Sequence, residues 1–168
     1  MESVQPREQR TISLFVANNP GVLIRIALLF SRRGYNLDSV VVSPAYKKGF
    51  SRMSVVVTGD GRMVQQIINQ LNKLVEVVHA TDHTGQAAIE QELVLVKVRC
   101  LPEQRTEILQ VADHFKCESV DLSPETITFK ATGGSDKLDA LHAMLDSYGI
   151  LESVRSGKLI MSRGSLPT

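Results

Sequence analysis

The stretch that decides the fold is Asn18-Asn19-Pro20-Gly21-Val22-Leu23, because it joins a strand-like run to a helix-like run. Residues 11–17 place apolar side chains at every second position, which predicts a strand. Residues 22–33 carry apolar side chains at helical spacing. Proline is preorganised for a helix start, and Gly21 lets another group approach the backbone closely.

The same stretch is a candidate binding site for a small anion. The first N–H groups of a helix have no partner inside the helix and carry partial positive charge, so they bind carboxylates and phosphates. Asn18 and Asn19 add both hydrogen-bond donors and acceptors. The loop therefore suits a ligand with a negative and a positive end, such as a free amino acid. A plain turn with a helix cap uses the same residues, so this segment alone leaves both interpretations open.

The rest of the first half continues the alternation of strands and helices. We expect strands at residues 37–43, 50–58 and 75–81, and a second helix with its apolar face between residues 63 and 74. Gly34 is placed to end the first helix in a left-handed conformation. The order β-α-β-β-α-β predicts a ferredoxin-like unit with both helices on one face of an antiparallel sheet.

The second half repeats this order. We expect strands near residues 93–100, 116–122, 126–132, 150–154 and 159–161, with one helix opened by Pro102 and another that follows Gly133-Gly134-Ser135. The sequence thus predicts an α+β fold of two tandem βαββαβ ferredoxin-like domains. The expected boundaries are a flexible leader at 1–9, a first domain at 10–82, a linker at 83–91, a second domain at 92–164 and a tail at 165–168.

Composition limits the classes of function. The chain has 168 residues, 43% of them hydrophobic and 22% charged, which is ordinary for a globular protein. Its net charge of +1 creates no long-range field for nucleic acid or anionic membranes, and no apolar run is long enough to span a bilayer. Cys100 and Cys117 form no Cys-x-x-Cys pair, so we expect a reducing, cytoplasmic location.

Catalytic and metal-binding motifs are not found in the sequence. His79 and His83 are four residues apart, but a zinc site needs three or four fixed ligands. Lys48-Gly49-Phe50 matches the start of an RNA-recognition motif, yet the aromatic residues that should follow are absent. An acylphosphatase-like enzyme would need an arginine in the loop at 17–21, which has none. We therefore expect no catalytic residues, no metal and no nucleic-acid partner.

Longer phrases of the chain carry a family resemblance. They include Leu29-Phe30-Ser31-Arg32-Arg33-Gly34-Tyr35-Asn36-Leu37-Asp38-Ser39, Ser51-Arg52-Met53, Glu92-Leu93-Val94-Leu95-Val96-Lys97-Val98 and the closing residues 157–164. From about Arg10 to Gly164 the chain resembles the regulatory (small) subunit of acetolactate synthase, also called acetohydroxyacid synthase. The Asn-x-Pro-Gly-Val-Leu phrase by itself marks only the wider class of amino-acid-binding ACT domains.

The resemblance implies a function. The first domain would be an ACT domain, and two copies of the chain would join through their ACT sheets. A separate catalytic subunit would use thiamine diphosphate, Mg²⁺ and FAD to form 2-acetolactate from two pyruvates, or to join pyruvate and 2-oxobutyrate. This chain would hold no cofactor, raise that subunit's activity and confer feedback inhibition by valine in branched-chain amino-acid biosynthesis. A freestanding amino-acid sensor with another partner is the competing interpretation.

The resemblance also implies the ligand site. The valine carboxylate would meet the N–H groups of Gly21, Val22 and Leu23, and Asn18 would bind the polar end. Asn36 of a second copy would close the site, and Leu37 of that copy would cover the isopropyl group together with Val22 or Leu23. Selectivity among valine, leucine and isoleucine stays open, since one methylene is worth only about 1–3 kcal/mol in an apolar pocket.

Overall fold

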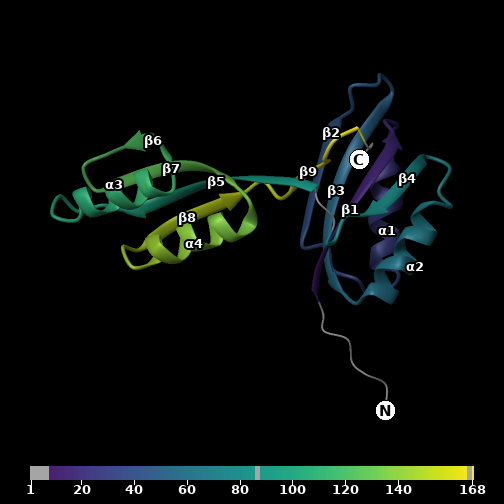
Figure 1. Cartoon of the computed structure of the whole chain (residues 1–168), viewed down its shortest axis with the longest axis horizontal. Coiled ribbons are helices and arrows are strands. Elements are labelled where there is room, and N and C mark those ends of the chain that lie inside the picture. The colour runs from purple at the N-terminus through teal and green to yellow at the C-terminus, as the bar shows by residue number, and fades with distance from the viewer. Residues whose placement is uncertain (1–7, 86–87, 166–167) are drawn as a thin grey trace, which may run out of the picture. The chain divides into compact units, whose positions relative to one another are not determined.

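The computed structural model describes residues 8–85, 88–165 and 168, and these form two compact units (Figure 1). The first unit comprises the chain up to Ile89 together with the returning segment 158–168. The second unit comprises residues 90–157. The chain therefore passes between the units twice, once before Glu90 and once after Gly157.

The first unit has the order of elements that the sequence predicts. Its elements are β1 (Glu8–Ala17), α1 (Val22–Ser31), β2 (Ser39–Pro44), β3 (Phe50–Gly59), α2 (Gly61–Leu71) and β4 (Val77–Asp82). The strands lie in the order β2-β3-β1-β4, and every neighbouring pair is antiparallel. Both helices cover one face of this sheet (Figure 1). The predicted ferredoxin-like architecture is confirmed.

The core of the first unit lies between the sheet and its two helices. Alternate side chains of β1 and β3 point to the helices because successive strand residues face opposite sides of a sheet. They meet the apolar stripes of α1 and α2 in one cluster, which includes Ile12, Leu14, Val16, Ile26, Phe30, Met53, Val55, Val57, Val64, Ile67 and Leu71. The Asp60 carboxylate begins α2 by accepting the N–H of Met63 at 2.7 Å, as an N-cap should.

The second unit repeats the two-layer arrangement. Its elements are β5 (Ala88–Arg99), α3 (Arg105–His114), β6 (Glu118–Leu122), β7 (Thr126–Gly133), α4 (Ser135–Asp146) and β8 (Ile150–Arg155). The strands lie in the order β6-β7-β5-β8, and β9 (Leu159–Ser162) pairs with β5 outside this path. Its separate core includes Val94, Val96, Val98, Ile108, Ile127, Phe129, Leu138, Leu141 and Leu145.

Several boundaries differ from those expected. β1 begins at Glu8, inside the expected leader, and β5 begins at Ala88, inside the expected linker. The first residues of β1 are polar and pair with β3, and β5 pairs with β9, so both strands have partners far along the chain that no local pattern reveals. Helix α3 begins at Arg105 rather than at Pro102, because a turn intervenes. Of the expected leader and linker, residues 1–7 and 86–87 lie outside the described residues.

A charged cluster fixes the start of the second unit. Glu92 is buried, and its carboxylate accepts two N–H groups of Arg155 at 3.0 Å and the hydroxyl of Ser135. Arg155 also donates to Asp139. Partial burial lowers the pKa of Arg155, but the hydrogen bonds and charges of Asp139 and Glu92 outweigh that effect and raise it overall. The guanidinium is therefore held in its charged form beside a buried carboxylate.

We expect Glu92→Ala to lower the free energy of unfolding by about 2–4 kcal/mol, because removing one partner leaves the guanidinium and a hydroxyl without their acceptor. Urea titration followed by circular dichroism measures this change. The matched control is Glu152→Ala, whose 3.5 Å ion pair with Lys97 is solvent-exposed and is worth less than about 1 kcal/mol. Equal losses in the two variants would contradict a special role for the buried carboxylate.

Candidate functional site

The loop at residues 18–21 is fixed at both ends by the sheet. The N–H of Ala17 donates to the Glu76 carbonyl at 2.8 Å, and the N–H of Asn18 donates to the Gly49 carbonyl at 2.9 Å. Gly21 then takes the left-handed conformation, with φ at +84°, and α1 starts at the next residue. A side chain at this φ is strained, so the turn favours glycine.

The first turn of α1 keeps unpaired N–H groups. No side chain caps the helix, and Val22 donates its N–H only to the Asn19 carbonyl at a long 3.3 Å. Within the described residues, the N–H groups of Gly21 and Leu23 have no hydrogen-bond partner. These donors and the positive end of the helix dipole leave a position for an anion in front of α1.

The predicted loop residues fall into two groups. Asn18 is exposed at the end of β1, and Leu23 is half-exposed on the first turn of α1. Both side chains are available to a ligand. Val22 is only 5% exposed and belongs to the core cluster, so its side chain is already surrounded by the protein. Of the two candidates for the apolar contact, Leu23 is therefore the one that remains accessible.

Asn36 and Leu37 lie beyond the other end of α1. The helix ends at a left-handed Gly34, with φ at +69°, as the sequence predicts. Asn36 is exposed and donates from Nδ2 to the Asp38 carboxylate at 3.2 Å, and Leu37 packs against the core edge. A ten-residue helix is about 15 Å long. A single chain thus holds Asn36 and Asn18 at opposite ends of α1 and does not bring them together.

Arg25 brings a positive charge close to this loop, which the sequence analysis did not predict. A Cβ atom built on Gly21 would lie 3.8 Å from Arg25 Nη1, so the guanidinium lies close to Gly21. Glu76 holds it there with a 2.7 Å ion pair to Nη2. The signal was present in the spacing: residues four apart on a helix are neighbours, and Arg25 is four residues after Gly21.

Among the described residues, the histidines and cysteines are scattered rather than clustered. His79 and His83, which are four residues apart in the sequence, have different partners. His83 Nε2 bonds the Ser13 hydroxyl at 2.7 Å, and His79 Nε2 bonds the Thr168 main-chain oxygen at 3.0 Å. Burial raises the pKa of the Cys117 thiol, against the opposing charge of Lys137, so the thiol stays protonated at neutral pH. Across residues 8–85, 88–165 and 168, no three His, Cys, Asp or Glu side chains gather as a metal site.

No helix in the described part of the chain is both long and apolar enough to cross a membrane.

Comparison with known proteins gives consistent matches along the chain. The family described as "Small subunit of acetolactate synthase" matches residues 91–164, and "AHAS small subunit-like ACT domain" matches residues 12–79. A probable acetolactate synthase small subunit of Archaeoglobus fulgidus is 41% identical over 157 residues, which are 94% of this chain and 98% of that protein. The acetolactate synthase small subunit of Mycobacterium bovis is 39% identical over 154 residues, 92% of each chain.

A solved structure has the same architecture. The crystal structure of the acetolactate synthase small subunit from Thermotoga maritima is similar with a TM-score of 0.84 and 34% identity. The match covers 95% of this chain and 99% of that chain. The similarity therefore extends over both units.

Proposed function

Because the chain belongs to the family of acetolactate synthase small subunits, we propose that it regulates a separate catalytic acetolactate synthase subunit by binding valine. The observation that carries the proposal is the uncapped N-terminus of α1, where the N–H groups of Gly21 and Leu23 are unpaired and Arg25 lies close to Gly21. Thiamine diphosphate, Mg²⁺ and FAD would belong to the catalytic partner. This chain would contribute activation and feedback inhibition.

The ligand site proposed here is shared by two copies of the chain. One copy supplies the N–H groups of Gly21 and Leu23 and the side chain of Asn18. The second copy supplies Asn36 and Leu37, which the first copy holds too far away. Valine would then stabilise one arrangement of the two copies by its differential affinity, which is how a ligand changes the activity of a distant centre.

The exposed apolar side chains of β2 support an arrangement in which two copies of the chain pair. Val40 and Val42 share the helix-covered face of the sheet, since they pair with the buried Val55 and Met53 across β3. They are nevertheless 38% and 46% exposed, because β2 is an edge strand. The β2 strand of a second copy would pair with this edge and cover the apolar side chains. An isolated unit leaves both the strand edge and the apolar side chains exposed.

Titration calorimetry of the purified chain with valine tests the proposal. We expect saturable binding of valine. Leucine and isoleucine should bind with comparable or lower affinity. Glycine is the comparison ligand that lacks the apolar contact. Binding of no amino acid by the chain, alone or with the catalytic subunit present, would contradict it.

Arg25 provides a prediction that the sequence did not suggest. We expect Arg25→Gln to weaken valine binding by about tenfold, since a charge-assisted interaction with a carboxylate contributes about 1.5 kcal/mol or more. Calorimetry measures the change. The control is Glu76→Gln, which removes the ion-pair partner but keeps the guanidinium, and it should weaken binding less. If Arg25→Gln binds valine normally, the guanidinium serves only the ion pair with Glu76.

A further inference from the structure

We propose that Arg52, His79 and Phe15 form a peptide-binding site on the open face of the first sheet, and that Thr168 of the returning segment occupies it. We call the described residues of this segment, 158–165 and 168, the strap. It is a second attachment of the chain to the first unit, made after the second unit is complete. The proposal does not depend on valine binding or on the catalytic partner.

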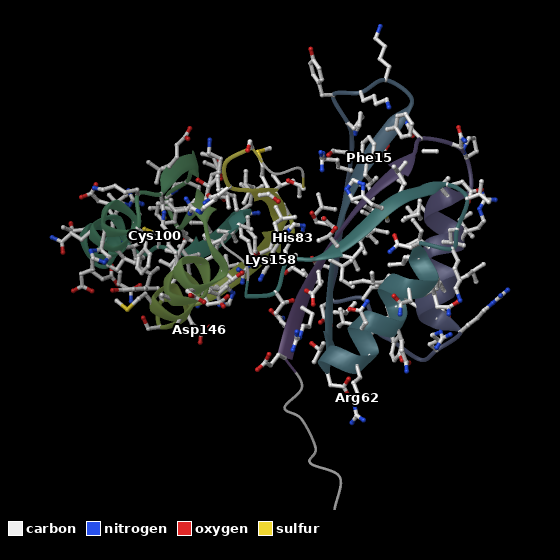
Figure 2. The ribbon with its side chains drawn as sticks, turned by 45° about the vertical axis from the view of Figure 1, so that its right-hand side comes forward. Phe15, Arg62, His83, Cys100, Asp146 and Lys158 are labelled. Atoms are coloured by element: carbon white, nitrogen blue, oxygen red, sulfur yellow. The ribbon has the colours of Figure 1, made fainter. Side chains whose placement is uncertain are left out.

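The site is a row of three side chains on neighbouring strands. Phe15 of β1 lies opposite Arg52 of β3 and opposite His79 of β4, so all three project from the face that α1 and α2 leave uncovered. Figure 2 labels Phe15 on this face. The Arg52 guanidinium lies 5.4 Å from the centre of the Phe15 ring, and the His79 ring lies 5.7 Å from it.

A further ring makes the row rigid. Phe50 stacks on Phe15 with ring centres 4.9 Å apart, and Lys47 lies 4.7 Å from the centre of the Phe50 ring. Cations over aromatic faces and stacked rings each stabilise such a geometry by about 0.5–1.5 kcal/mol. Arg52 and His79 are therefore held with their N–H groups directed at one position, which suits an acceptor oxygen.

The strap supplies that acceptor. The main-chain oxygen of Thr168 accepts from Arg52 Nη1 at 2.6 Å and from His79 Nε2 at 3.0 Å. The Thr168 hydroxyl accepts the N–H of Ser162 at 2.8 Å, which closes the strap on itself. Thr168 is only 7% exposed. A residue of the expected tail is thus among the buried polar residues of the first unit.

The bound strap gives the chain an anchor on the first unit after the second unit ends. The second unit begins at Glu90 and ends at Gly157, and the strap starts at the next residue, Lys158 (Figure 2). With the strap bound, the chain is anchored to the first unit on both sides of the second unit. Release of the strap would remove the anchor that follows Gly157 and would expose the row of Phe15, Arg52 and His79.

Limited proteolysis of the full chain tests the site. Arg163 lies exposed within the strap and is a trypsin cleavage point. We expect Arg52→Ala and His79→Leu each to speed cleavage after Arg163 by about tenfold, because one lost hydrogen bond shifts the opening equilibrium by that factor and cleavage follows the open population. His79→Gln, which keeps a side-chain N–H donor, should stay close to the unaltered chain.

The control is Arg62→Ala, an exposed arginine on α2 at the helical side of the same sheet. It should leave cleavage after Arg163 unchanged, and circular dichroism checks that each variant is folded. Hydrogen exchange at the Ser162 amide gives a second readout, expected to quicken in the same two variants. Unchanged cleavage and exchange in Arg52→Ala and His79→Leu would overturn the site. Loss of valine binding with an intact strap response would instead count only against the proposed function.

Discussion

Replacing Gly21 by aspartate should abolish valine inhibition of the reconstituted enzyme, with valine binding weakened at least about 100-fold. The new carboxylate would stand at the N-terminus of α1, where the valine carboxylate is proposed to bind. Two like charges about 4 Å apart repel by about 4 kcal/mol near a protein surface, which exceeds the roughly 2.8 kcal/mol that a 100-fold change requires. Calorimetry and inhibition assays measure the loss.

The fold should survive this substitution. A Cβ at position 21 meets nothing closer than the Arg25 guanidinium at 3.8 Å, and aspartate is a favourable residue at a helix N-terminus. The left-handed backbone at +84° adds a strain of about 1–2 kcal/mol for any side chain. Gly21→Ala carries the same strain without the charge and is the matched control. If Gly21→Asp remains sensitive to valine, the carboxylate does not bind at this helix end.

A large effect on dimerisation is expected from a substitution in the edge strand β2. Val42→Glu should convert the proposed dimer into monomers, because it places a carboxylate among the exposed apolar side chains of the edge strand β2. An unpaired charge in an interface costs several kcal/mol, so dissociation should rise by more than about 100-fold. Sedimentation should then report about 18.5 kDa, the mass of one chain, in place of twice that value.

Val78→Glu is the matched control for this variant. Val78 lies on β4, the opposite edge of the same sheet, and is 57% exposed. It should leave the dimer and valine binding intact, whereas Val42→Glu should lose both, since the proposed site needs residues from two copies. A dimer that survives Val42→Glu but not Val78→Glu would place the interface at the other edge.

The order of elements could be predicted because it follows from local periodicity. Apolar residues recur every second position along β1 and β3 and at helical spacing along α1 and α2, and Gly34 ends α1 where expected. Each of these signals lies within a few residues of the element that it forms. The family phrases around Gly21 and Arg52 then identified the family, which the comparisons confirm.

The features that were missed depend on residues far apart in the sequence. Strand β5 begins before the predicted strand, and its pairing with β9 joins segments some sixty residues apart. The buried Thr168 accepts hydrogen bonds from Arg52 and His79, which meet on a face that helices do not cover. The guanidinium of Arg25 is placed beside Gly21 by an ion pair with Glu76, some fifty residues away. No local pattern carries these contacts.

The most direct test of the proposed function is the rate of 2-acetolactate formation by the catalytic subunit, measured with and without this chain and across a range of valine concentrations. Addition of the chain should raise the rate, and valine should then lower it with a saturable dependence that Gly21→Asp removes. A rate that is the same with and without the chain, at every valine concentration, would contradict the role of a regulatory subunit.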